Sequence, residues 1–164
     1  MSLSEKVERL ARMVPGVSGY QDKESSRDTD KNIRLRVAAE LEQLKRDLED
    51  DKRRLMDKKN LSLLPALDRV GSQLDKLANT VRYASRGYSG VFDSNKLDVK
   101  KLDQLCTFDL KLMDEMATLK TQAKQVHDSH GDETALKQAI EDLSHALHGF
   151  EKIFSTRQDI LMAR

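Results

Sequence analysis

The stretch LSLLPALDRVGSQLDKLANTVRYASR, residues 61–86, decides the fold of this chain. Its apolar side chains recur at alternating intervals of three and four residues, at Leu67, Val70, Leu74, Leu77, Val81 and Ala84. This spacing places them on one stripe of an α-helix, whereas a half-buried β-strand would place an apolar side chain at every second position. Pro65 suits the first turn of such a helix. The stretch therefore predicts an amphipathic helix that packs along its partners through a narrow apolar seam.

The same spacing recurs on both sides of this stretch. We predict further helices over residues 2–14, 21–58, 98–127 and 133–162. Four long stripes joined by short connections indicate an all-α fold, an elongated up-down-up-down antiparallel four-helix bundle with coiled-coil-like packing. A short N-terminal amphipathic helix, residues 2–14, precedes the bundle, with a capping box formed by Ser2 and Glu5. We expect one domain over residues 1–164.

The stretch of residues 21–32 contains no apolar side chain. We therefore expect it to lie outside the core, although the long helix of residues 21–58 continues through it. Because this helix is longer than its neighbour at residues 61–86, the polar stretch extends beyond the hairpin. This extension brings the loops at residues 15–20 and 87–95 toward one end, together with the C-terminus.

The composition excludes several classes of protein. The chain has 29 Lys and Arg against 28 Asp and Glu, and its net charge of +1 argues against nucleic-acid binding, which needs a clustered positive excess. Basic runs such as residues 52–54 alternate with acids and are expected to form solvated helix surfaces. No apolar run is long enough for a membrane span, and the charged N-terminus is unlike a secretory signal, so we expect a cytoplasmic protein. The single cysteine, Cys106, is expected to be a small buried apolar residue.

Two glycine-tyrosine loops are the strongest candidates for a binding surface. The segments GVSGY (residues 16–20) and GYSGVFD (residues 87–93) hold four of the seven glycines and three of the seven aromatic residues. Glycine permits close backbone approach, and tyrosine offers contact area with few rotatable bonds. Alternatively, the glycines only end helices and the tyrosines cap an exposed end of the bundle. The candidate partner-binding residues are Gly16, Gly19, Tyr20, Tyr83, Arg86, Gly87, Tyr88, Gly90, Phe92 and Asp93.

The histidines have a spacing that invites a metal site, since His127 and His130 are three residues apart, as are His145 and His148. The two pairs are too far apart along the last hairpin to share one ion. The Glu-x-x-His motif of di-iron bundles is absent from the sequence. We therefore expect solvated histidines, no metal and no cofactor.

Asp109 stands where the seam of its helix expects an apolar residue, and it is the one ionisable group that we expect to be at least partly buried. A buried carboxylate needs a partner, because it would otherwise protonate or destabilise the fold. The candidates by position along the helices are Arg34, Arg36, Arg82 and Tyr83. We expect Asp109 to fix the register of the helices rather than to be catalytic, and we expect no enzyme.

Two phrases of the sequence resemble those of an uncharacterised family of small prokaryotic all-helical proteins. They are VPGVSGYQDKE (residues 14–24), followed by Arg27, Asp30 and Lys31, and RYASRGYSGVFD (residues 82–93). The resemblance covers roughly residues 5–120. It implies no activity and no catalytic residues, and it draws attention to the same two loops.

The resulting functional hypothesis is a non-enzymatic interaction or assembly protein, a scaffold or adaptor. Its glycine-tyrosine loops would bind a protein partner or a second copy of the chain. One alternative is a bundle that binds a metal or a small ligand through Asp109 or the histidines. Another is peripheral association with a membrane through residues 2–14, although the mixed charges of this segment favour docking on the bundle or on another subunit.

Overall fold

The computed structural model describes residues 1–19, 21–84 and 98–162. These ranges contain five α-helices: α1 (Leu3–Met13), α2 (Lys23–Asp57), α3 (Leu64–Arg82), α4 (Val99–Asp128) and α5 (Glu133–Met162). No residue in the described ranges belongs to a β-strand. The prediction of an all-α fold is confirmed.

Side-chain caps determine where the first two helices begin. The predicted capping box is present at α1, where Glu5 N–H donates to Ser2 Oγ at 3.3 Å and Ser2 N–H donates to the Glu5 carboxylate at 2.6 Å. A second capping box, which the sequence analysis missed, starts α2 through Asp22 and Ser25. Each box satisfies backbone N–H groups that the first helical turn leaves without partners.

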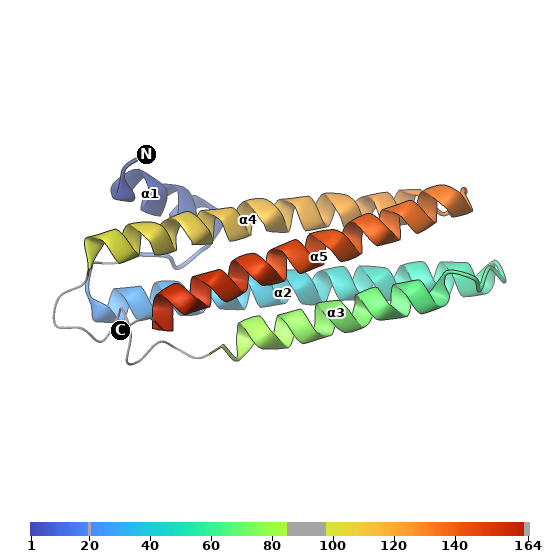
Figure 1. The fold of residues 1–164 in the computed structure, drawn as a ribbon, viewed down its shortest axis with the longest axis horizontal. Coiled ribbons are helices and arrows are strands. Elements are labelled where there is room, and N and C mark those ends of the chain that lie inside the picture. Colours follow the sequence, from blue (N-terminus) through green and yellow to red (C-terminus); the bar gives the residue numbers. More distant parts are fainter. Residues whose placement is uncertain (20, 85–97, 163–164) are drawn as a thin grey trace.

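The long helices lie side by side (Figure 1). The most extensive contacts join α2 to α3 and α4 to α5, smaller ones join α2 to α4 and α3 to α5, and α1 contacts α4. Helices α2 and α4 begin at one end of the molecule, and α3 and α5 finish there. We call this the loop end. The opposite end, where α2 leads into α3 and α4 into α5, is the turn end. Helix α3 begins at Leu64, later than the predicted residue 61. The turn that precedes it contains Lys59, whose φ of 54° is in the left-handed region.

The apolar seams predicted from the sequence form the core. In α3 the buried side chains are Leu67, Val70, Leu74, Leu77 and Val81, together with Gly71 and Ala78. Cys106 is fully buried, as predicted. Burial of one large aliphatic side chain contributes about 1.5–3 kcal/mol, so a seam of this length can hold a helix with many charges on its outer surface.

The polar stretch of residues 21–32 corrects one prediction. The helix does continue through it, but Ser26, Thr29 and Asp30 are buried, so one side of the stretch faces the interior. Thr29 Oγ1 donates to the carbonyl of Gly19 at 2.9 Å, and Ser26 Oγ donates to the carbonyl of Asp22 at 2.7 Å. Hydrogen bonds of this kind allow hydroxyl groups to be buried without an apolar side chain. A helical segment can therefore contribute buried side chains without apolar residues at regular spacing.

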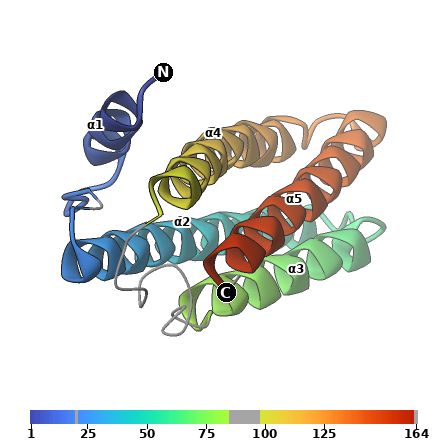
Figure 2. The same cartoon turned by 60° about the vertical axis from the view of Figure 1, so that its left-hand side comes forward.

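Helix α1 lies beside the part of α4 nearest the loop end (Figure 2). Its Leu10 is fully buried, and two of its basic side chains reach acids of α4, with Lys6 Nζ at 2.6 Å from Asp103 Oδ1 and Arg9 Nη2 at 3.2 Å from Asp114 Oδ1. The apolar stripe of α1 is therefore directed toward the rest of this chain.

Candidate functional site

The first glycine-tyrosine loop folds back onto the start of α2. Gly16 and Gly19 have φ values of 84° and 103°, which L side chains rarely adopt. The Gly16 carbonyl accepts a hydrogen bond from Asn32 Nδ2 at 2.9 Å, as the Gly19 carbonyl does from Thr29. Gly16 is exposed and Gly19 is buried. These two candidate binding residues therefore shape the loop and tie it to α2.

Tyr83 ends α3 at the loop end and is 76% exposed. The other candidates, Tyr20, Arg86, Gly87, Tyr88, Gly90, Phe92 and Asp93, lie outside the described residues. The backbone carbonyl of Arg82, the residue before Tyr83, accepts a hydrogen bond from Arg34 Nη1 of α2 at 3.0 Å.

Three large hydrophobic side chains are exposed where helices end or begin at the loop end. Tyr83 ends α3, Val99 begins α4 with 66% of its surface exposed, and Met162 ends α5 with 46% exposed. Burying such groups would be favourable, because apolar surface gains free energy when it leaves water. Two comparable side chains, Met56 and Leu61, are exposed at the turn end.

A buried ionic network lies behind the loop end. Arg157 of α5 donates through Nε to the Asp109 carboxylate of α4, and its Nη2 lies 2.9 Å from Asp30 Oδ1 of α2. Asp30 Oδ2 also accepts from Arg34 Nε at 3.0 Å. All four side chains are at most 5% exposed, so three helices share charges in a region of low dielectric constant.

This network confirms that Asp109 is buried and corrects the choice of its partner. The observed partner, Arg157, was not among the candidates, and Arg36 and Arg82 pair instead with Glu40 and Glu42 at 2.8 Å each. Asp109 is also one of several buried ionisable groups rather than the only one. The other buried acidic and basic side chains in the described ranges are Asp30, Arg34, Asp51, His130 and Arg157.

A third buried acid organises the turn end. Asp51 of α2 is almost fully buried, and its Oδ1 lies 2.9 Å from His127 Nδ1 and 3.0 Å from His130 Nε2. Arg54 Nη1 lies 3.5 Å from the same oxygen and donates to the His127 carbonyl at 3.1 Å. The cluster ties the α4–α5 turn to α2.

His130 corrects the prediction that all histidines are solvated. Its side chain is buried, whereas His127, His145 and His148 are exposed. Burial lowers the pKa of His130, and the nearby Arg54 lowers it further, against the opposite effect of Asp51. Because Nε2 faces Asp51 and the buried Nδ1 has no hydrogen-bond partner, a second proton on this ring would be left without an acceptor. The neutral ring is therefore the form that fits this site.

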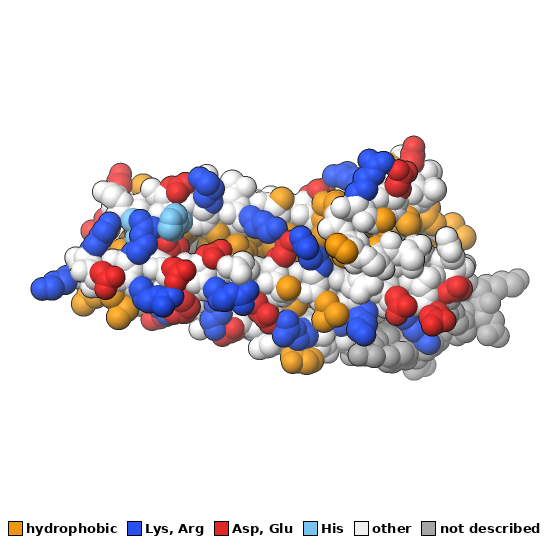
Figure 3. Space-filling view, turned by 180° about the vertical axis from the view of Figure 1, so that it is seen from behind, with side chains coloured by type: hydrophobic (Ala, Val, Ile, Leu, Met, Phe, Trp, Pro, Cys, Tyr) orange, Lys and Arg blue, Asp and Glu red, His pale blue; other side chains and the backbone are white. Residues whose placement is uncertain are grey.

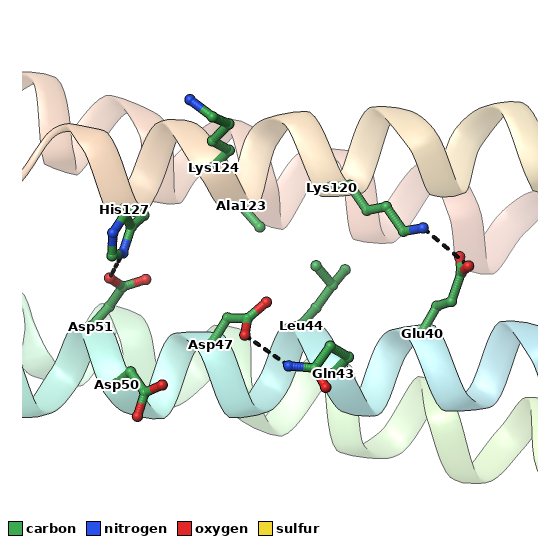
Figure 4. Close-up of a pocket in the computed structure, with 10 residues that line it drawn as sticks. All are labelled: Glu40, Gln43, Leu44, Asp47, Asp50, Asp51, Lys120, Ala123, Lys124 and His127. Carbon is green, nitrogen blue, oxygen red and sulfur yellow. Dashed lines mark hydrogen bonds and ion pairs between the residues drawn. The ribbon is translucent and has the colours of Figure 1, made fainter.

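A groove separates α2 from α4 between the middle of the molecule and the turn end, with a volume of about 510 Å³. Figure 4 shows Leu44 and Ala123 between two contacts that join the helices, one from Lys120 Nζ to Glu40 Oε1 at 3.0 Å and one from His127 to Asp51. The remaining lining residues are Gln43, Asp47, Asp50 and Lys124. On the face shown in Figure 3, acidic and basic side chains intermingle, and hydrophobic side chains are visible between them.

Within the described ranges, no group of three or more His, Cys, Asp or Glu side chains is arranged to hold a metal ion. Of the helices as described, none combines the length and hydrophobicity needed to cross a membrane. Comparisons with protein-family models, with curated proteins and with solved structures found no match to this chain. The side chains and their placement are therefore the basis for a functional proposal.

Proposed function

We propose that this chain is a non-enzymatic interaction or assembly protein of the cytoplasm, a scaffold or adaptor whose loop end docks a protein partner or a second copy. The observation that carries the proposal is the exposure of Tyr83, Val99 and Met162 on the ends of three helices that meet at one end. Aromatic and methionine side chains are enriched in the buried centres of protein interfaces. The glycine-tyrosine composition of residues 16–20 and 87–93 adds to this argument.

In this proposal α2–α5 form an elongated up-down-up-down antiparallel bundle with coiled-coil-like packing, and α1 is docked on it. The pairing of α2 with α3 and of α4 with α5 supports this arrangement, as do the smaller α2–α4 and α3–α5 contacts. The ionic network of Asp30, Asp109 and Arg157 would hold the helix ends in one register and so present a fixed docking surface. The resemblance to an uncharacterised helical family stays a prediction and adds no activity.

The alternatives have different support. Membrane association through α1 would require its apolar stripe to leave α4, although Leu10 is fully buried there. A site for a small ligand is favoured by the groove between α2 and α4, which is separate from the loop end.

Site-specific photo-cross-linking tests the docking proposal. A photoreactive phenylalanine analogue would replace Tyr83 in the full chain, and a matched variant would carry it at Leu61, which is exposed at the turn end. We expect cross-links to a second copy, or to a specific protein of the source cell, from position 83 and not from position 61. Equal yields from the two positions, or no cross-link from position 83, would contradict the proposal.

A further inference from the structure

We propose that the groove between α2 and α4 binds a small organic cation, a protonated amine that carries an alkyl chain. This site is separate from the loop end and does not depend on the docking function. The proposal stands on the closed ends of the groove, its apolar floor and a carboxylate on its wall that has no cationic partner.

The groove has defined ends. Glu40 and Lys120 close it toward the middle of the molecule, and Asp51 and His127 close it toward the turn end. Along α2 the two closing acids are separated by about 16 Å, from a rise of 1.5 Å per residue. Pockets that bind small molecules usually have volumes of about 300–1,000 Å³. The groove, at about 510 Å³, has room for a short chain molecule.

The floor between these closures is apolar. Leu44 of α2 and Ala123 of α4 face one another there (Figure 4), and Leu44 belongs to the core of the molecule. Lys124 of α4 lines the groove, but its ammonium group points away from α2 and pairs with Asp128 at 2.7 Å (Figure 4). A bound alkyl chain would therefore contact carbon atoms, and no lysine would repel its ammonium group at the centre of the groove.

The carboxylate of Asp47 supplies a negative charge that complements the ammonium group of the ligand. Its carboxylate accepts a hydrogen bond from the neutral amide of Gln43 at 2.9 Å and lies on the α2 wall of the groove. In the part of the chain that the structure describes, no Lys, Arg or His lies within ion-pair distance of it.

The other acids of the groove each have cationic partners. Glu40 has Arg36 and Lys120, Asp50 has Arg53, and Asp51 has Arg54. Asp47 is thus the uncompensated negative charge above the apolar floor, so an ammonium group is favoured there over an anion or a neutral group.

Nuclear magnetic resonance titration of the full chain with hexylammonium chloride tests this site. We expect saturable shifts of the Leu44 and Ala123 methyl signals, weaker binding of the neutral hexanol, and no binding of hexanoate. The variant Asp47→Asn should bind hexylammonium about twofold to fivefold more weakly, the range expected for loss of one exposed ion pair. Asp57→Asn removes the same charge from an exposed position near the end of α2 and should leave the affinity unchanged.

Two results would overturn the proposal. One is the absence of saturable shifts at the groove methyl groups when hexylammonium is added to the folded protein. The other is equal binding of hexylammonium and hexanol with no effect of Asp47→Asn, which would show that the carboxylate does not select the ligand. Because the loop-end residues are not involved, neither result would bear on the docking function.

Discussion

Arg157 of α5 and Asp109 of α4 form an ion pair in which neither side chain is exposed to solvent. Arg157 also pairs with Asp30 of α2, so one guanidinium connects three helices. Moving charges out of water costs free energy that the pairing only partly recovers, and the network is therefore a poor source of net stability. Removing one member is different, because the partners of that member stay buried after losing its opposite charge.

The variant Arg157→Met is therefore expected to lower the free energy of unfolding by about 3–5 kcal/mol. The loss comes from removing the buried guanidinium that pairs with both Asp109 and Asp30. Urea denaturation followed by circular dichroism measures the change. The control Arg53→Met breaks an exposed pair with Asp50 and should cost less than about 1 kcal/mol. Equal losses in the two variants would contradict the assignment.

The double variant Asp109→Leu, Arg157→Met should recover most of the stability that Arg157→Met loses. Replacing both partners with apolar side chains removes the buried charges together with their desolvation cost. The same denaturation experiment checks this, and a double variant no more stable than Arg157→Met would show that the network does not act through its charges.

His130 is expected to make the protein less stable in acid. Its pKa in the folded state lies below the ordinary value of 6.5, because burial and Arg54 disfavour the charged ring. The unfolded chain then binds more protons, so stability is present at neutral pH and falls as the pH drops below about 6.5 toward the folded-state pKa. Thermal unfolding of His130→Gln between pH 7 and pH 5 should show a smaller loss than the wild type.

His145, which is exposed on α5, provides the control for this prediction. The variant His145→Gln should keep the wild-type dependence of stability on pH. If His130→Gln and the wild type lose the same stability between pH 7 and pH 5, burial of His130 is not the cause of the acid sensitivity.

Replacing Gly16 or Gly149 with alanine should change the stability of the protein in opposite directions. Gly16→Ala puts a side chain at a φ of 84° and its Cβ 2.8 Å from Asn32 Nδ2, so we expect a loss of about 1–2 kcal/mol. Gly149 lies within α5 with no atom of another group near its Cβ position, and Gly149→Ala should stabilise by about 0.5–1 kcal/mol. Thermal unfolding of both variants measures the difference, and a stabilised Gly16→Ala would show that the loop does not need its left-handed residue.

The apolar seams and the burial of Cys106 and Asp109 could be predicted from the sequence, because each depends on spacing within one helix. The same spacing contained a signal that was overlooked. Phe150, Phe154, Arg157 and Leu161 are separated by four, three and four residues, which places Arg157 in the seam. Asp30 and Asp51 likewise occupy seam positions of α2. A charged side chain at a seam position can therefore be buried.

The pairing of these charges could not be predicted from spacing. Which basic group reaches Asp109 depends on how α2, α4 and α5 are rotated about their axes, and no single helix contains that information. The same holds for the groove, since its walls come from two helices and its closing contacts, Lys120 with Glu40 and His127 with Asp51, join them. Contacts between helices therefore had to come from the structure.

Docking at the loop end is the central claim, and light scattering with a defined pair of variants tests it most directly. Tyr83→Ser, Val99→Ser removes exposed apolar surface at the loop end, and Met56→Ser, Leu61→Ser removes similar surface at the turn end. We expect the wild type and the turn-end variant to form the same complex, with a second copy or with the cross-linked partner, and we expect the loop-end variant to remain an 18.7 kDa monomer. A folded loop-end variant that still forms the complex would contradict the claim.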